Sequence, residues 1–314
     1  MMADKRIGEA ASEAEREIEA VLGAVSPWQG RDLRYGPVHG GISNSNWKVR
    51  IDGEPGSYFV KVPGRGTEMF IDRAAASEAS RRAEALKIGP RTYDYLDHQG
   101  VEIADFIEGR RPCTNSDFQS PEVRARVLGL YRTFNDSGLL GLTKTVFDMI
   151  EEHVEQVRTL NGAFPADFAW LYKQYRLARS ALEASGIDLV PCFNDPMPGN
   201  FLIAEDGSIM LIDYEYASNN DRCYELGIWC GEMFFSDAIE NEVLETYFGR
   251  AEPRMKARLI VHKALADVKW STWAMVQNAV SALDFDFYKY GAWKHMRARS
   301  IMQDPRWVDY LRAV

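Results

Sequence analysis

The sequence has few cysteines and no long apolar run. Its 314 residues include four cysteines (Cys113, Cys192, Cys223 and Cys230) with no C-x-x-C spacing, which favours free thiols in a reduced cytoplasm. No apolar run approaches the ~20 residues that a membrane-spanning helix needs. The charged N-terminus, M-M-A-D-K-R-I-G-E-A, is not typical of a signal peptide. We therefore expect a cytoplasmic protein.

Positive charge is also in short supply. The chain carries 37 Lys and Arg against 46 Asp and Glu, a formal net charge of −9. This balance argues against nucleic acid as a partner, because nucleic-acid binding needs a basic surface. It is compatible with a small cationic substrate. Apolar residues make up 46% and charged residues 26%, so the chain is globular and large enough for one large domain or two smaller ones.

The most informative stretch is residues 191–216, P-C-F-N-D-P-M-P-G-N-F-L-I-A-E-D-G-S-I-M-L-I-D-Y-E-Y. It predicts a polar loop, a strand over Phe201–Ala204, a tight turn and a second strand over Ile209–Ile212. Asp206 and Gly207 form a pair that two-residue hairpin turns favour, since both central positions need positive φ. The stretch therefore predicts a β-hairpin centred on that pair.

A hairpin with this centre predicts a metal site. Its register places Asn200 opposite Asp213, and directly paired residues have Cβ atoms about 4.5–5.5 Å apart. An amide oxygen and a carboxylate so placed suit Mg²⁺, which takes oxygen ligands and shares them with substrate phosphates. Asp195 lies on the preceding loop as a third acid, five residues before Asn200 and held by Pro196 and Pro198. Each of these residues alone would more often serve to hydrogen-bond the backbone of a turn. The three together favour a site for phosphoryl transfer.

The motifs N-D-x-x-x-x-N and I-D-Y-E-Y-A resemble those of the choline/ethanolamine kinases, within the aminoglycoside-phosphotransferase and protein-kinase-like group. The resemblance covers roughly residues 38–290. It implies an α+β, bilobal protein-kinase-like fold that uses ATP and Mg²⁺. We expect a small antiparallel-sheet lobe over residues 1–106, with a leading helix at about 9–24, and a larger helical lobe over residues 107–314. Asp195, Asn200 and Asp213 are the expected catalytic residues, with Asn200 and Asp213 holding the metal.

The first lobe contains candidate nucleotide-binding residues. A lysine within an apolar strand, such as Lys61, needs a carboxylate or a phosphate unless it reaches outward to solvent. The resemblance implies that Lys61 contacts the α- and β-phosphates. It also implies a flap of backbone N–H groups over the phosphates and a hinge that meets the adenine; the residues assigned to these are Gly41, Ser43, Asn44, Asp105 and Ile107. Gly-Gly alone would equally suit an ordinary hairpin entrance.

Two positions depart from the family pattern. Relatives place a glutamate where this chain has Ala76, and Glu78, two residues further on, is a candidate partner for Lys61. Two residues turn a helix by about 200°, which would point Glu78 away. Relatives also have a histidine immediately before Asn-Asp, where this chain has Phe193, and we expect that ring to substitute by packing.

Aromatic residues near the C-terminus are candidates for binding the acceptor. Trp270 and Trp273 lie on one face of a predicted helix, and Phe287 and Tyr290 are three apart on the next segment. Such a stripe is more often core. The resemblance instead implies a choline pocket of these four rings with Glu232. A quaternary ammonium group cannot donate hydrogen bonds and is recognised by ring faces, each worth about 0.5–2 kcal/mol; this favours choline over ethanolamine.

Other functions remain open at this point. The acceptor could be another small alcohol: ethanolamine, a different methylated amine or an aminoglycoside. Alternatively, the chain is a nucleotide-binding module without activity, for which Ala76 and Phe193 are the evidence. The expected partners are the small acceptor and ATP, with no nucleic acid and no membrane insertion, and a homodimer is left open.

Overall fold

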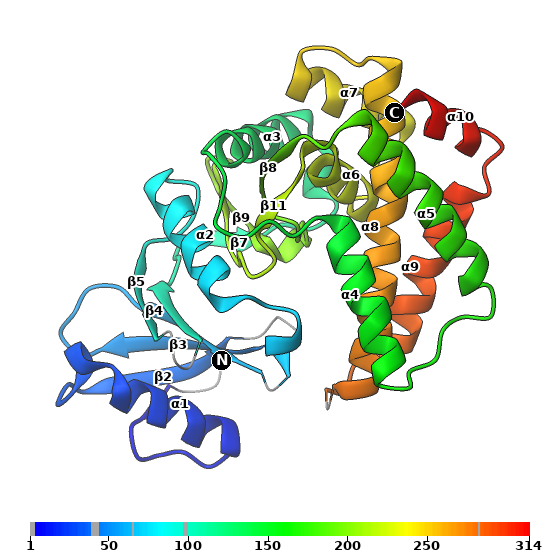
Figure 1. The fold of residues 1–314 in the computed structure, drawn as a ribbon. Coiled ribbons are helices and arrows are strands. Elements are labelled where there is room, and N and C mark those ends of the chain that lie inside the picture. Colours follow the sequence, from blue (N-terminus) through cyan, green and yellow to red (C-terminus); the bar gives the residue numbers. More distant parts are fainter. Residues whose placement is uncertain (1–3, 39–43, 65, 97–99, 282) are drawn as a thin grey trace.

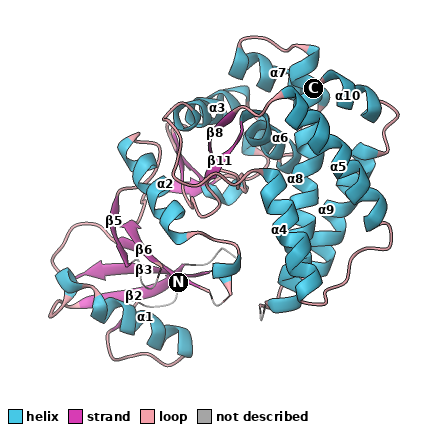
Figure 2. Ribbon diagram, viewed as in Figure 1, coloured by secondary structure: helices cyan, strands magenta, loops and turns pink. Residues whose placement is uncertain are grey.

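The fold consists of an antiparallel sheet followed by a mostly helical part (Figures 1 and 2), which confirms the α+β prediction. A computed structural model describes residues 4–38, 44–64, 66–96, 100–281 and 283–314. The first part is a six-stranded sheet in the order β1-β2-β3-β4-β6-β5, with antiparallel neighbours throughout. Its strands are β1 (Lys5–Arg6), β2 (Leu33–Val38), β3 (Asn44–Ile51), β4 (Tyr58–Pro63), β5 (Thr92–Leu96) and β6 (Val101–Asp105).

The leading helix covers one face of this sheet (Figure 1). It is α1 (Glu13–Ala24), and a capping box starts it: Ser12 Oγ accepts from the Glu15 N–H, and the Glu15 carboxylate accepts from the Ser12 N–H. Side chains alternate across a strand, so every second residue of β3 and β4 faces the helix. The resulting core includes Ile18, Leu22, Trp47, Val49 and Val60.

The next helix, α2 (Arg73–Ala85), connects the sheet with the rest of the molecule. Asp72 caps it by accepting from the Ala75 N–H at 3.0 Å. Ala79 and Ala83 are small enough for α2 to pack closely on the second part. There they join a core cluster that includes Phe201, Leu211 and Tyr214.

The chain leaves the first sheet after Asp105. Residues 106–109 carry it to β7 (Arg110–Pro112), which pairs with a hairpin strand of the second part. That three-stranded sheet has the order β10-β9-β7, with β9 (Phe201–Ala204) and β10 (Ile209–Leu211). We keep the boundary between lobes near residue 106 as a proposal.

The second part is built around one long helix, α8 (Pro253–Val280), of 28 residues. It is buried along most of its length because α4, α6 and α9 pack around it (Figure 1). No described helix is long and apolar enough to cross a membrane. The remaining elements are α3 (Pro121–Asn135), α4 (Val146–Thr159), α5 (Phe168–Ser185), β8 (Leu189–Cys192), β11 (Ser218–Asp221), α6 (Arg222–Glu232), α7 (Asp237–Phe248), α9 (Phe287–Met302) and α10 (Trp307–Ala313).

A glycine sets the spacing between α6 and α8. A Cβ atom built on Gly227 would lie 3.0 Å from the Leu259 carbonyl oxygen and 3.0 Å from the Lys263 backbone nitrogen. These are backbone atoms of α8, which cannot turn aside as a side chain can. The close approach therefore requires glycine at position 227, and it holds the middle of α6 against α8.

The hairpin has a different register from the predicted one. Ile203 pairs with Ile209 and Phe201 with Leu211, so Asn200 is next to Ile212 rather than opposite Asp213. The prediction assumed positive φ at both Asp206 and Gly207. Only Gly207 has it, at φ 76°. The Asp206 carboxylate instead accepts from the Ser208 N–H at 2.8 Å, and the loop has three residues between Ala204 and Ser208, which shifts the pairing by one.

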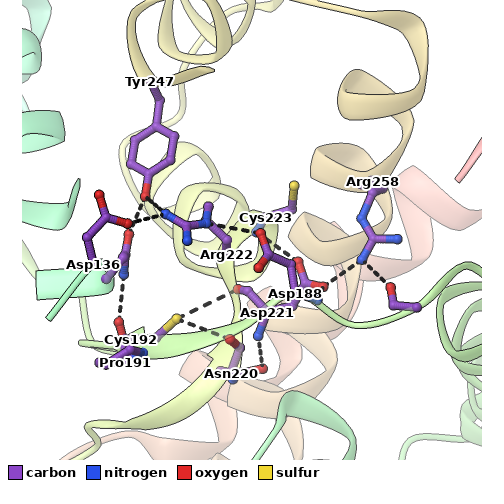
Figure 3. Close-up of polar contacts among 12 residues, drawn as sticks. Asp136, Asp188, Pro191, Cys192, Asn220, Asp221, Arg222, Cys223, Tyr247 and Arg258 are labelled. Atoms are coloured by element: carbon purple, nitrogen blue, oxygen red, sulfur yellow. Dashed lines mark hydrogen bonds and ion pairs between the residues drawn. The ribbon is translucent and has the colours of Figure 1, made fainter. Parts of the chain in front are cut away.

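A buried ionic cluster at the start of α6 stabilises the second part (Figure 3). Asp221 caps the helix by accepting from the Cys223 N–H at 2.8 Å, and its other oxygen accepts from Arg258 at 2.6 Å. Burial alone would raise the pKa of Asp221. The charges of His262 and Arg258 outweigh burial and hold that pKa well below its usual range.

Replacing Asp221 with alanine is expected to lower the free energy of unfolding by about 3–5 kcal/mol, because Arg258 would remain buried without its counter-charge and α6 would lose its cap. The matched control is Asp188→Ala. Asp188 pairs with Arg222 at 3.0 Å in the same region, but its side chain is 60% exposed. That pair is expected to contribute about 1 kcal/mol or less. Equilibrium denaturation in urea measures both; equal, small losses would contradict the assignment.

Candidate active site

Asp195 lies in the loop that follows β8, at a position set by the residue before it. Asn194 has φ 65°, a left-handed conformation that asparagine tolerates better than most residues. Its side-chain amide donates to the Tyr216 carbonyl oxygen and to Ser218 Oγ, both at 2.9 Å. These bonds tie the loop to the segment that follows the hairpin, so Asp195 has a fixed position beside it.

Asn200 contacts Asp195 directly. The Asn200 amide nitrogen donates to Asp195 Oδ2 at 3.1 Å and to the Asp195 carbonyl oxygen at 3.0 Å. The Asp195 side chain is half-buried. Burial first, and the nearby charge of Asp213 second, raise the pKa of Asp195 to about 7, while Lys269 and the Asn200 bond oppose the rise. The structure therefore brings Asp195 and Asn200 together and places Asp213 near them.

Asp213 follows β10 at the point where the chain leaves the hairpin. The Ile212 N–H donates to the Asn200 carbonyl oxygen at 3.0 Å, and Asp213 then turns with φ 70°. Its Oδ1 atom accepts from Lys61 Nζ at 2.9 Å. Burial raises the pKa of Asp213 even though Lys61 acts in the opposite direction. Asp213 thus joins the hairpin to the lysine predicted for the first lobe.

Lys61 is buried and surrounded by acids. It is 4% exposed, so it does not reach outward to solvent. Its Nζ lies 2.9 Å from Asp213, 3.0 Å from Glu102 and 3.4 Å from Glu215. Burial would lower the pKa of Lys61, but the three carboxylates outweigh it and hold the pKa well above its ordinary value. The lysine is therefore charged and fixed beside the loop acids.

The candidate pairing of Glu78 with Lys61 is wrong. Glu78 forms an ion pair with Arg82 at 3.2 Å, one turn further along α2, and accepts from the Gly141 N–H at 2.9 Å. Glu78 thus points away from Lys61, as expected from the turn of about 200° that two residues add in a helix. The acid of the first lobe that pairs with Lys61 is Glu102, directly opposite it in the neighbouring strand β6. A second charged residue within an apolar strand was the signal that would have identified it.

Glu215 is a further site residue that the sequence reasoning did not assign. It is buried, and both carboxylate oxygens accept from the Asn44 side-chain amide at 3.0 Å. Arg73, the first residue of α2, donates to it at 2.9 Å. Glu215 thereby connects β3, α2 and Lys61 of the first part with the segment after the hairpin. In the sequence, the position of Glu215 two residues after Asp213 was the feature that could have indicated it as a site residue.

The other predicted nucleotide-binding residues are only partly described. Gly41 and Ser43 lie outside the described residues. Asn44, the first residue of β3, is held by Glu215 as above. Asp105 ends β6, three residues after Glu102, and the half-buried Ile107 lies in the passage between the two sheets. The acids around Lys61 are Glu102, Asp213 and Glu215 rather than Asp105, so the assignment of Asp105 and Ile107 stays a prediction.

Phe193 fills its position by packing. Its ring is fully buried and lies edge-on to Tyr214 at a centroid distance of 5.2 Å and to Phe201 at 6.4 Å. The Phe193 backbone N–H donates to the Glu225 carboxylate at 2.6 Å. The ring therefore belongs to the core beneath the loop, and the orientation of that loop depends on backbone contacts rather than on a histidine side chain.

The predicted aromatic residues come together in the structure. The Trp273 ring lies 5.3 Å from Trp270, 5.8 Å from Phe287 and 6.1 Å from Tyr290, centroid to centroid, in edge-on arrangements. The rings of Trp270, Trp273 and Phe287 are buried and belong to the main core of the second part. Tyr290 is partly buried and packs against that core. Tyr216, which the prediction did not include, lies edge-on to Trp270 at 5.3 Å.

Glu232 has a partner within the chain. This residue ends α6 and forms a hydrogen-bonded ion pair with the fully buried Lys294 of α9. The Lys294 ammonium also lies 5.2 Å from the centre of the Tyr290 ring. Sequence reasoning missed Lys294 because its position relative to Glu232 depends on how α9 packs beside α6. The acid therefore faces a lysine of its own chain in this structure.

Comparisons with known proteins identify the family of the chain. A sequence model of the choline/ethanolamine kinase family matches residues 36–244. Protein LicA of Haemophilus influenzae is 23% identical over 76% of this chain and 72% of its own length. Probable choline kinase 2 of Arabidopsis thaliana is 22% identical over 88% of this chain and 89% of its own.

Solved structures show the same fold. A choline/ethanolamine kinase family protein from Mesorhizobium loti superposes with a TM-score of 0.80 at 26% identity, covering 95% of this chain and 98% of that one. Choline kinase LicA from Streptococcus pneumoniae gives 0.77 at 21% identity, covering 96% and 100%. An aminoglycoside phosphotransferase gives 0.63 at 15%, covering 97% and 99%, so the protein-kinase-like bilobal fold is confirmed. The chain belongs to the choline/ethanolamine kinase family and is a small-molecule kinase.

Proposed function

We propose that this chain transfers the γ-phosphoryl group of ATP to the hydroxyl of choline or a closely related small amino alcohol. The observation that carries the proposal is the position of Asp195. Its half-buried carboxylate is held by Asn200, lies close to Asp213, and is tied through Asp213 to the buried Lys61. A base, a pair of oxygen ligands and a fixed cation are the parts that phosphoryl transfer requires.

In the proposed reaction, Asp195 orients the acceptor hydroxyl and takes its proton. The hydroxyl oxygen forms a bond to the γ-phosphorus, the bond from that phosphorus to the bridging oxygen of ATP breaks, and ADP leaves. General-base assistance of this kind contributes about 10²–10⁴ in rate. Lys61 would contact the α- and β-phosphates as a fixed cation, which is supported by its burial among acids.

The donor set at the hairpin fits a magnesium ion. The amide nitrogen of Asn200 donates to Asp195, so the side-chain carbonyl oxygen of Asn200 is left for a metal. Asp213 would supply a carboxylate. No group of three or more His, Cys, Asp or Glu suited to a metal occurs in the described part of the chain. Mg²⁺ takes one or two carboxylates together with substrate phosphates, so it does not need such a group. When bound, the ion neutralises phosphate charge.

Nucleotide contacts are assigned to both sides of the boundary near residue 106. The assignment of Asn44 to the nucleotide site is supported by its hydrogen bond to Glu215, which lies 3.4 Å from Lys61. Gly41 and Ser43 are assigned from the family motif, and so are Asp105 and Ile107, at the passage between the sheets. A hinge at this passage would let the lobes close over the substrates and exclude water.

The acceptor site is assigned to Glu232 and four rings: Trp270, Trp273, Phe287 and Tyr290. Their clustering around Trp273 supports a site for a cationic head group, because ring faces attract cations that cannot donate hydrogen bonds. This favours choline or a methylated relative over ethanolamine. A cytoplasmic location is supported by the four buried cysteines, none of which forms a disulfide.

Release of ADP from Mg-ATP tests the proposal across a panel of alcohols. The panel contains choline, ethanolamine, its mono- and dimethylated forms and an aminoglycoside. We expect the highest kcat/KM for choline or a methylated form, and no turnover when Mg²⁺ is omitted. Preference for the aminoglycoside would assign a different acceptor. Stabilisation by Mg-ATP without ADP release from any alcohol would instead indicate a nucleotide-binding module.

A further inference from the structure

Lys269 lies next to Trp270 on α8, and its amino group is buried without a polar partner. The residue is 1% exposed. Its Nζ forms no hydrogen bond with any described residue. Buried amino groups are normally paired, because desolvating an unpaired polar group costs free energy. An unpaired one at this place therefore calls for a reason other than stability.

The amino group rests on the rings assigned to the acceptor site. Its Nζ lies 3.0 Å from the centre of the Trp270 ring and 4.4 Å from the centre of the Tyr216 ring. The two rings are edge-on to each other, with centroids 5.3 Å apart, and form an aromatic corner. A bound cation sits within about 6 Å of a ring centre. Lys269 occupies that position in the aromatic corner formed by Trp270 and Tyr216.

Charged groups around Lys269 place it at the acceptor end of the site. Burial lowers the pKa of Lys269, and the charge of Asp195 is the largest influence in the other direction. The lysine also lines a small cavity of about 20 Å³ with Phe70, Lys144 and His153. A volume of that size holds roughly one water molecule. The side chain thus feels the charge of the proposed base and lines a cavity that Tyr216 of the aromatic corner also lines.

The other buried lysine in this region differs in one respect. Lys294 lies near the Tyr290 and Trp293 rings, at 5.2 and 5.1 Å, but it also pairs with Glu232. Its removal would leave an acid buried without a counter-charge, which is strongly destabilising. Lys269 has no hydrogen-bonded acid of this kind, so its removal breaks no buried ion pair. A substitution of Lys269 can therefore test whether an amino group on the ring faces affects the binding of a cation there.

We propose that Lys269 is a specificity-determining residue whose amino group occupies the aromatic corner of Trp270 and Tyr216 and competes with the ammonium head of the acceptor. The amino group at 3.0 Å excludes a methyl group from that ring face whether or not it is protonated. When it is protonated, it also repels a cationic head. Binding of a cationic acceptor then requires the lysine to move aside. The inference rests on the proposed acceptor site.

Tetramethylammonium is the probe for this competition, because it carries the cationic head without a hydroxyl and needs no catalysis. Its dissociation constant is measured by calorimetry for the wild-type chain and for Lys269→Met. We expect the variant to bind the probe about tenfold more tightly, the scale of one aromatic face freed for a cation. A KM for choline that falls in parallel supports the proposal. Structural damage would weaken binding, so a gain distinguishes the two.

Lys144→Met is the matched control. Lys144 lines the same cavity, but it pairs with Glu152 at 2.5 Å and lies on neither ring of the aromatic corner. Its replacement is expected to leave probe affinity within about twofold of wild type, since general charge effects at a screened distance are small. An equal gain in both variants would overturn the assignment to Lys269.

Failure of this inference is separable from failure of the proposed function. If the wild type phosphorylates amino alcohols but folded Lys269→Met binds the probe no more tightly, Lys269 does not compete and the kinase assignment stands. If no alcohol is phosphorylated but the probe binds more tightly, the competition is real and the reaction assignment is wrong. Lys269→Gln, measured in the same way after a melting-temperature check, keeps the test valid should the methionine variant not fold.

Discussion

Asp195→Asn is expected to lower kcat by about 10²–10⁴, because the amide keeps the shape of the side chain but cannot take the proton of the acceptor hydroxyl. Asparagine can still accept the bond from Asn200 through its carbonyl oxygen, so the loop should keep its position. ATP binding should change little, since Asp195 is assigned to the acceptor. ADP release under saturating substrates measures kcat, and titration with a fluorescent ATP analogue measures binding.

Asp206→Asn is the control for this substitution. Asp206 lies at the tip of the same hairpin, is exposed, and its carboxylate accepts from the Ser208 N–H. Asparagine makes the same turn contact, so kcat should remain near the wild-type value. A folded Asp195→Asn enzyme with kcat within tenfold of wild type would exclude Asp195 as the base.

Lys61→Met is expected to affect stability and nucleotide binding together. Lys61 is the shared counter-charge of three acids, Asp213, Glu102 and Glu215, at 2.9–3.4 Å. Removing one member of a buried ionic cluster costs about 3–5 kcal/mol, because the remaining charges stay desolvated and repel one another. The variant should also lose the proposed contact with the α- and β-phosphates. Urea denaturation gives the first effect and the KM for ATP the second.

Lys48→Met provides the comparison. Lys48 lies on the neighbouring strand β3 and pairs with Glu108 at 2.5 Å, but that glutamate is 62% exposed. Exposed pairs contribute about 0–1 kcal/mol, so this substitution should be nearly neutral. If Lys61→Met were equally mild in stability and in the KM for ATP, the acids around Lys61 would not depend on it.

Local signals in the sequence were enough to predict the hairpin at the centre of the site. Asp206 and Gly207 marked a turn, and alternating apolar residues on either side marked two strands, which is why the hairpin was found. The register failed by one residue because it depended on whether Asp206 would adopt positive φ or cap Ser208, and both are ordinary behaviours of aspartate. The alternation of apolar residues and the turn residues predict that a hairpin forms, but they do not decide between two turn conformations of Asp206.

Contacts between distant segments were less accessible. Lys61 could be singled out as a lysine in an apolar strand, but its partner Glu102 is set by the pairing of β4 with β6, which local pattern does not specify. The bond from Arg73 to Glu215 likewise joins α2 to the end of the hairpin. Lys269 could not be separated from the charged residues elsewhere on α8, since its burial follows from helices packing around it.

The ion pair between Lys61 and Asp213 has a consequence for how nucleotide enters. One oxygen of Asp213 is engaged by Lys61 before any phosphate arrives, and the lysine is sealed from solvent. In the proposed function, Lys61 would contact phosphate and Asp213 would hold the ion, so binding of Mg-ATP would exchange the ionic partners of both residues. Such an exchange would keep both groups paired, and so would avoid the free-energy cost of an unpaired charge in the interior.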